Sequence, residues 1–344
     1  MGQTPPAPAA AHVSVYAHRG ASALLPEHTL AAYAQAIADG ADYIEPDLVM
    51  SRDGVMLARH ENEIGSTTDV ATHPEFAARK TRKQIDGETV SGWFTEDFSV
   101  AELKTLYVRE RLPALRGTAF NGQFRIATLD EIIAFLVQQS ARAGRGIGLA
   151  PEIKHSGYFR SIGLPMEDAL LATLRADSYT NVAPVLIQSF ETDNLRYLRR
   201  QLGTNSNIRL LQLLGPAQQR PADVRLAAGD TDYAAMMTPA GLGRIAGYAD
   251  GIGVERRQLI PLDAQGRLGR PGALIADAHA AGLMVVAYSF RPENTFLPPA
   301  LRQGADHIRH PAGSIAEIRA YVDAGIDAFF TDDPALGRQA LDAR

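Results

Sequence analysis

Two patterns of apolar and polar residues alternate along the chain. Short apolar runs of strand length are separated by segments in which apolar residues recur every three or four positions, the spacing of a helix that packs on one face. Strands are predicted at residues 14–17, 42–50, 55–60, 147–154, 184–190, 209–214, 251–254, 284–290 and 328–331. Helices are predicted at residues 27–39, 129–142, 166–176, 192–202, 239–248, 272–281 and 314–324.

Strands that alternate with helices indicate an α/β fold with a mainly parallel sheet. The number of predicted strands favours a closed TIM-type (β/α)₈ barrel, which typically needs roughly 250 residues. The chain has 344 residues, and the excess falls in residues 61–126, where the βα rhythm stops. We therefore expect a single domain over residues 14–344 with a small insertion after the second strand. A flexible, Pro/Ala-rich N-terminus is expected at residues 1–13.

The composition of the chain limits the kinds of binding partner and the kinds of chemistry that we expect. Apolar residues make up 46% of the chain and charged residues 21%, as in ordinary globular proteins. The formal net charge of −5 gives no global attraction for nucleic acid or a membrane surface, and no apolar run is long enough to cross a bilayer. The chain has no cysteine, which excludes disulfides, thiolate metal sites and cysteine nucleophiles.

Polar side chains gather where the predicted strands end. Glu45 and Asp47 are two residues apart on one strand, so they project from the same face, and Glu152 and Lys154 do likewise on another. The active sites of TIM barrels lie at the carboxyl ends of the strands. The residues expected to converge there are His18, Arg19, Glu45, Asp47, His60, Glu152 and Lys154.

Three carboxylates at one place need a counter-charge, since two unit charges 4 Å apart repel by ~4 kcal/mol at an effective dielectric of ~20. Oxygen ligands suit a hard divalent cation, Ca²⁺ or Mg²⁺. The alternative is structural, because acidic pairs at strand ends also bind Lys or Arg. His18 and His60 suit general acid–base catalysis, because imidazole titrates near neutral pH.

Several motifs resemble the glycerophosphodiester phosphodiesterase family, in the family's order and spacing over roughly residues 14–340. They are His18-Arg19-Gly20, Pro26-Glu27-His28-Thr29, Gly40 to Leu48, His60, Pro151-Glu152-Ile153-Lys154, Gln188-Ser189-Phe190 and Phe330-Thr331-Asp332-Asp333-Pro334. Residues 248–253 and 288–291 look like the periplasmic bacterial branch. Three positions depart from the common pattern: His28 replaces Asn, Glu61 replaces Asp, and Pro46 separates two ligand candidates.

The resemblance implies metal-dependent hydrolysis of small glycerophosphodiesters to sn-glycerol 3-phosphate and an alcohol. It implies one divalent cation, with Ca²⁺ favoured and Mg²⁺ as the alternative, and a periplasmic or secreted location, although the chain starts with no signal peptide and a cytoplasmic location stays open. The implied metal ligands are Glu45, Asp47 and Glu152, and the implied catalytic residues are His18 and His60. The implied substrate-binding residues are Arg19, Lys154, Gln188, Tyr288, Phe290 and Arg291.

Other points stay open at the level of sequence. We favour His60 as the acid and His18 as the base, and the nucleophile is either water or the neighbouring hydroxyl of the substrate glycerol. A phospholipase acting on intact lipids, which should show an apolar rim, and a non-catalytic phosphodiester-binding protein are the rival functions. We further expect the insertion to cover the mouth and to confine the alcohol with Trp93 and Phe94. The sequence predicts no nucleic-acid partner and no stable membrane insertion, and it leaves the oligomeric state open.

Overall fold

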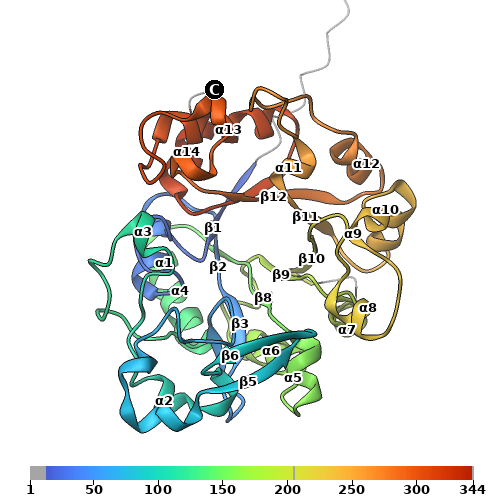
Figure 1. Ribbon diagram of the computed structural model, residues 1–344. Coiled ribbons are helices and arrows are strands. Elements are labelled where there is room, and N and C mark those ends of the chain that lie inside the picture. Colours follow the sequence, from blue (N-terminus) through green and yellow to red (C-terminus); the bar gives the residue numbers. More distant parts are fainter. Residues whose placement is uncertain (1–12, 204–205, 343–344) are drawn as a thin grey trace, which may run out of the picture.

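A closed barrel of parallel strands forms the centre of the protein in the computed structural model, which describes residues 13–203 and 206–342 (Figure 1). Every neighbouring pair around the barrel is parallel, and β13 pairs with β1 to close it. Eight positions are filled, two of them by a pair of short strands, β2 with β3 and β7 with β8. The strands are β1 (Ser14–His18), β2 (Tyr43–Glu45), β3 (Asp47–Met50), β7 (Gly148–Leu149), β8 (Glu152–Ile153), β9 (Val185–Ser189), β10 (Ile208–Leu214), β11 (Gly251–Glu255), β12 (Met284–Phe290) and β13 (Ala328–Thr331). The predicted TIM-type barrel is therefore confirmed.

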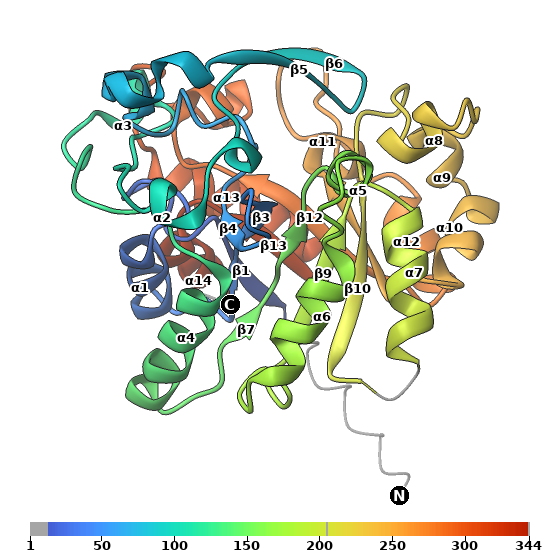
Figure 2. The same cartoon turned by 90° about the horizontal axis from the view of Figure 1, so that it is seen from below.

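Helices surround the barrel and connect its strands (Figures 1 and 2). Their apolar faces and the outward faces of the strands form one large buried cluster. The helices are α1 (Leu30–Ala38), α4 (Leu129–Ala143), α5 (Ser156–Ser161), α6 (Glu167–Ala176), α7 (Asp193–Leu202), α8 (Ala222–Leu226), α9 (Tyr233–Met236), α10 (Pro239–Ala246), α11 (Arg256–Leu259), α12 (Leu274–Ala280), α13 (Pro311–Asp323) and α14 (Pro334–Asp342), with 3₁₀ turns η4 (Asn294–Phe296) and η5 (Pro299–Leu301). In the part of the chain described, no helix is both long and apolar enough to cross a membrane.

A second, smaller set of side chains fills the inside of the barrel. Tyr16, Leu211, Val286 and Phe330 belong to it, and the rings of Tyr16 and Phe330 meet edge to face at 5.2 Å. Gly253 of β11 makes room for these large neighbours, because a Cβ there would lie 2.4 Å from the Leu213 side chain. The interior is thus packed, and only its carboxyl end is left for a site.

Two local features depart from the predicted elements. The first helix begins at Leu30 rather than residue 27, because Thr29 caps it by accepting from the Ala32 amide, and His28 holds a left-handed backbone (φ 59°). The predicted strand at 42–50 is divided at Pro46, and the one at 147–154 is divided before Glu152. A proline has no N–H to donate to a neighbouring strand, so the ladder is interrupted where Pro46 and Pro151 lie.

The inserted segment follows the antiparallel strand β4 (Met56–Ala58), which pairs with β3 across the predicted turn. It contains η1 (Val70–Thr72), η2 (Pro74–Arg79), the hairpin β5 (Thr81–Ile85) and β6 (Glu88–Gly92), η3 (Thr95–Asp97), α2 (Val100–Leu103) and α3 (Pro113–Arg116). The β5–β6 hairpin lies at one side of the mouth of the barrel, near α5, and its tip points toward α8 (Figures 1 and 2). Apart from Val13, the expected flexible stretch at residues 1–13 lies outside the described residues, so that prediction stays untested.

Candidate active site

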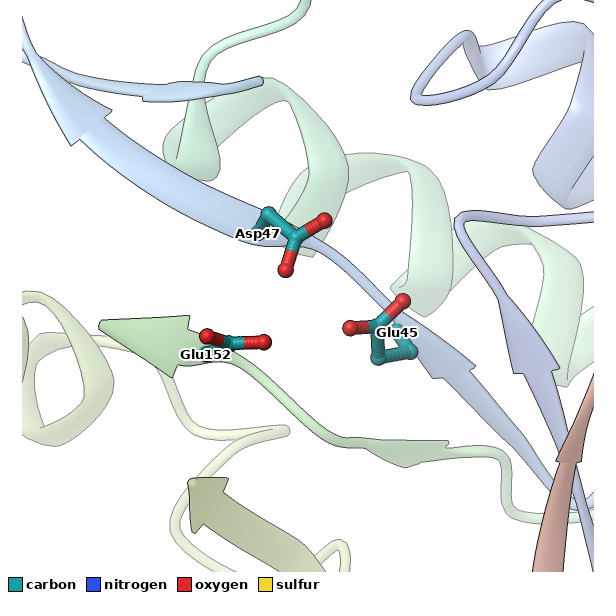
Figure 3. A group of neighbouring side chains, drawn as sticks. All are labelled: Glu45, Asp47 and Glu152. Carbon is teal, nitrogen blue, oxygen red and sulfur yellow. The ribbon is translucent and has the colours of Figure 1, made fainter. Parts of the chain in front are cut away.

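Three buried carboxylates point toward one another at the carboxyl end of the barrel (Figure 3). Glu45 ends β2, Asp47 starts β3, and Glu152 starts β8, where it pairs in register with Asp47. Each offers one oxygen to a group whose members all lie within 4.8 Å of one another. The Oδ1 atom of Asp47 is buried without a hydrogen-bond partner, which is costly unless a ligand satisfies it. This all-oxygen set therefore fits a hard divalent cation.

The electrostatics of the group show how strongly it needs a positive charge. Burial, together with the charges of Asp47 and Glu152, raises the pKa of Glu45 well above its ordinary value. Burial also raises the pKa of Glu152 to about 8. Burial acts the same way on Asp47, but Lys154 and the nearby imidazoles outweigh it and hold the Asp47 pKa well below its usual range. A bound cation would favour the ionised form of all three, so binding would release protons.

Neighbouring groups hold the carboxylates in place. The backbone N–H of Arg19 donates to Glu45 Oε2 (2.7 Å), and the side-chain amide of Gln188 donates to Glu45 Oε1 (3.2 Å). Lys154 donates to Glu152 at 2.8 Å, and His28 Nε2 lies 2.9 Å from Asp47 Oδ2. His28, which departs from the family pattern, thus orients a ligand candidate, and its left-handed backbone is the kind of local strain that collects at functional sites.

His18 and His60 each bind a carboxylate through Nδ1. His18 Nδ1 lies 2.6 Å from Asp332 Oδ1, and His60 Nδ1 contacts Glu61 Oε1. Despite burial, the charge of Arg116 holds the pKa of Asp332 well below its usual range, and the hydrogen bond with His60, together with Arg111, does the same for the pKa of Glu61. Both acids are therefore ionised, and each Nδ1 carries the proton. Each neutral ring then presents the lone pair of Nε2. Desolvation, followed by the charge of Arg19, lowers the pKa of His18 to about 4 and that of His60 to about 3.

One cavity of about 160 Å³ receives these groups. Its walls include the two histidines, Arg19, Glu45, Glu152, Lys154, Gln188, Phe190, Leu213, Tyr288, Ser289, Arg291 and Phe330. A larger cavity of about 760 Å³ adjoins it and shares Phe190 and Tyr288 with it. The rest of the larger cavity is lined mostly by polar residues, among them Asp86 and Glu88 of the inserted hairpin.

The structure brings together almost all the residues that the sequence singled out, although their roles stay predictions. Phe290 is the exception, because its side chain is 1% exposed and packs on Phe329 and Tyr321 behind the strand. Pairing shifts in register between Ala287 and Phe290, and Ser289 rather than Phe290 lines the cavity. Trp93 does not line it either, since its indole donates to the Phe76 carbonyl.

Sequence reasoning did not assign the partners of the two imidazoles. Asp332 follows β13 at a strand end, so the rule that found Glu45 and Asp47 could have found it as well. Glu61 directly follows His60 and stands where the family usually has Asp, and these were the signals for it. Nothing in the sequence indicated that Arg111 and Arg116, from the insertion, would reach Glu61 and Asp332.

The chain is similar in sequence and in fold to proteins described as glycerophosphodiester phosphodiesterases. The sequence pattern of the Glycerophosphoryl diester phosphodiesterase family matches residues 18–336. A glycerophosphodiester phosphodiesterase of Arabidopsis thaliana is 35% identical over 332 residues, which cover 92% of this chain and 82% of that protein. A putative glycerophosphoryl diester phosphodiesterase from Silicibacter pomeroyi has a similar fold, with a TM-score of 0.66 at 21% identity, covering 97% of this chain and 94% of the other. An Oleispira antarctica phosphodiesterase in complex with the product sn-glycerol-3-phosphate has a TM-score of 0.57 at 21% identity, with 96% of each chain covered.

The barrel and its site thus define an enzyme of the phosphoric diester hydrolase class. The chain belongs to the glycerophosphoryl diester phosphodiesterase family, and glycerophosphodiester phosphodiesterase is its activity.

Proposed function

We propose that the chain hydrolyses small, water-soluble glycerophosphodiesters to sn-glycerol 3-phosphate and an alcohol, in a reaction that requires a divalent cation. The observation that carries the proposal is the meeting of a buried carboxylate group with two carboxylate-bound histidines at one small cavity. The relative from Oleispira antarctica, which is described in complex with sn-glycerol-3-phosphate, supports this choice of product.

Glu45, Asp47 and Glu152 would hold the cation, with Ca²⁺ favoured by the resemblance to the periplasmic branch and Mg²⁺ as the alternative. When bound, the cation supplies Lewis-acid stabilisation of the charge that develops on the phosphate oxygens. Arg19 and Lys154 supply fixed positive charge on the same cavity wall. Both are already oriented by carboxylates, Arg19 by Glu27 and Lys154 by Glu152, so little reorganisation is needed when the diester enters.

The two imidazoles divide the proton transfers. His18, neutral and with Nδ1 held by Asp332, uses Nε2 to take a proton from the nucleophile. His60 gives a proton to the leaving alkoxide. After desolvation, the charges of Arg19 and Lys154 are the main causes of its low pKa, and a bound diester anion offsets those charges. The substrate itself therefore favours the protonated form of His60.

The larger cavity is the place for the alcohol part of the diester. It adjoins the small cavity, with which it shares Phe190 and Tyr288, and six of its twelve lining residues carry a carboxylate, amide or guanidinium group. A polar head group such as choline or glycerol suits these walls, whereas acyl chains would need an apolar surface. This polarity favours a soluble diester over an intact phospholipid.

The direct test is release of sn-glycerol 3-phosphate from glycerophosphocholine, followed by an enzyme-coupled assay with Ca²⁺, with Mg²⁺ and with chelator. We expect release with a divalent cation and none with chelator. Release of phosphocholine and glycerol instead would contradict the proposed cleavage position. Equal turnover of phosphatidylcholine would favour the phospholipase function, and binding of the diester without turnover would favour a binding protein.

A further inference from the structure

Two arginines of the inserted segment lie outside the cavity yet make ion pairs with the carboxylates that hold the histidines. Arg116 ends α3, and Arg111 precedes that helix. Their side chains are 7% and 23% exposed, respectively, and neither lines the cavity. Substrate contact therefore does not account for them.

Arg116 acts on the His18 side of the site. Its Nη2 donates to Asp332 Oδ2 at 2.6 Å, while the other oxygen of Asp332 binds His18. Its Nε donates to Glu293 at 2.6 Å, and its Nη1 donates to the Ser22 carbonyl at 2.7 Å. Since all three nitrogens are used, the guanidinium is fixed in one orientation, and its Nη2 holds the Oδ2 atom of Asp332 in place.

Arg111 repeats the arrangement on the His60 side. Its Nη2 donates to Glu61 Oε2 at 2.6 Å and its Nη1 to Glu61 Oε1 at 3.0 Å, and Oε1 is the atom that binds His60. Its Nε and Nη2 donate to Glu27 at 2.8 and 2.7 Å. Glu27 in turn accepts from Arg19 at 3.0 Å, so Arg111 is linked to a phosphate-binding candidate as well as to a histidine.

We infer that Arg111 and Arg116 are positioning residues, through which the inserted segment holds both imidazoles with Nε2 facing the reacting phosphate. The inference rests on the proposed function, in which His18 and His60 transfer protons. Each chain of contacts runs from an arginine of the insertion to a carboxylate and then to an imidazole. The segment thus contributes to the catalytic geometry from behind the site, which is a different role from covering the substrate.

The simpler explanation is that these ion pairs only fasten the segment to the barrel. Both explanations predict instability when a buried charge loses its partner, so alanine variants would not separate them. Lysine keeps the charge but replaces the planar fork with a single donor. It cannot hold Glu61 through two nitrogens, as Arg111 does, and it cannot bind Asp332 while its other nitrogens are fixed by Glu293, as Arg116 does. Arg111→Lys and Arg116→Lys therefore test positioning itself.

The matched control is Arg79→Lys. Arg79 belongs to the same segment and donates to Glu102 at 2.6 Å. Among the described residues, neither member of that pair makes a hydrogen bond or ion pair with His18, His60, Glu61 or Asp332. For the two test variants we expect kcat on glycerophosphocholine to fall by roughly 10–100-fold, the usual effect of losing an outer-shell partner, with KM changed less than about twofold. Melting temperature and kcat of the control should stay close to those of the unchanged protein.

A second substrate distinguishes a loss of imidazole positioning from a general loosening of the active site. A diester with a nitrophenyl leaving group needs no acid, so it bypasses whichever histidine protonates the leaving group. With His60 as the acid, the kcat loss of Arg111→Lys should shrink on this substrate, while that of Arg116→Lys should persist; with the roles exchanged, the pattern exchanges. Either pattern supports the inference.

The inference would be overturned by kcat losses that are equal on both substrates or that the Arg79 control shares. A change that appears only in KM would also overturn it. So would a kcat within about threefold of the unchanged protein. If a lysine variant does not fold, Arg111→Gln and Arg116→Gln serve in its place. They leave the carboxylate without a charged partner, so the comparison between the two substrates, and not the size of the kcat loss, is the result that counts for them. An unchanged protein that cleaves neither diester would refute the proposed function instead, so the two failures are distinguishable.

Discussion

His18 and His60 are the residues whose loss should be felt most directly in the chemistry. We expect His18→Ala and His60→Ala each to lower kcat on glycerophosphocholine by at least ~10²-fold, the usual size of general acid–base catalysis. The double variant should lose much less than the product of the two, because the pair acts as a unit. His279→Ala is the control, since that ring pairs with Asp327 outside the cavity. A near-normal kcat for His60→Ala would refute its role.

Glu191 allows a prediction about stability at the residue scale. Burial, with added repulsion from Asp86 and Asp223, raises its pKa to about 8 in the folded chain, from an ordinary value of 4.5. A raised pKa stabilises the fold below pH 4.5, and that contribution is lost as pH rises through 8. Glu191→Gln mimics the protonated carboxyl, so its melting temperature should match the unchanged protein at pH 4 and exceed it at pH 9.

The pKa difference of Glu191 also sets the expected size of the stability gain in Glu191→Gln. Each unit of pKa difference corresponds to about 1.4 kcal/mol, so a gain of at least ~1 kcal/mol at pH 9 is expected. Thermal unfolding between pH 4 and pH 9 measures it. Glu88→Gln, a change at an exposed hairpin position, should show no such trend. Parallel melting curves for Glu191→Gln and the unchanged protein at every pH would contradict the prediction.

At the scale of elements, the β5–β6 hairpin, rather than Trp93 and Phe94, borders the cavity that we propose for the alcohol. Phe94 is fully buried and Trp93 packs within the segment, while Asp86 and Glu88 border the larger cavity. Asp86→Asn with Glu88→Gln should raise KM for glycerophosphocholine roughly two- to fivefold, the range of an exposed charge pair. KM for glycerophosphoglycerol, which has no cationic group, should change less. Equal KM changes for both diesters would show that the hairpin does not sense the head group.

At the scale of the whole molecule, the carboxylates that would hold a cation come from separate strands. A cation bound by Glu45, Asp47 and Glu152 would join β2 and β3 to β8, so its removal should loosen the barrel as well as stop catalysis. Chelation should abolish activity and lower the melting temperature, and an ion at 100 times its Kd adds about 2.7 kcal/mol to the free energy of unfolding. The increase in melting temperature on adding Ca²⁺ should be smaller at low pH, because the carboxylates then bind protons instead of the cation.

The variant that tests cation binding directly is Glu152→Gln, which keeps the side-chain size but removes the charge of one proposed ligand. Calorimetric titration should give weaker Ca²⁺ binding to this variant. Full activity after exhaustive chelation, with elemental analysis showing no metal, would refute the dependence.

The sequence by itself determined the barrel and most of the charged residues at its carboxyl end. Apolar periodicity located the barrel strands, because a strand buried between a packed interior and a layer of helices must be apolar over its length. The strand-end rule then brought His18, Glu45, Asp47 and Glu152 to one place, since parallel strands in a barrel all end on the same face. Both inferences depend only on local pattern and on the fixed geometry of a strand.

Only the tertiary structure decided which groups support the site from outside. Asp332 is 314 residues from His18 along the chain, and Arg116, which lies between them in the sequence, is 216 residues from Asp332. Such contacts leave no periodicity, because they depend on where a loop without regular pattern comes to lie on the barrel. The same holds for Phe290 and Trp93, whose side-chain directions are set by a register shift and by packing within the insertion. Periodicity predicts the direction of a side chain only where the backbone is regular.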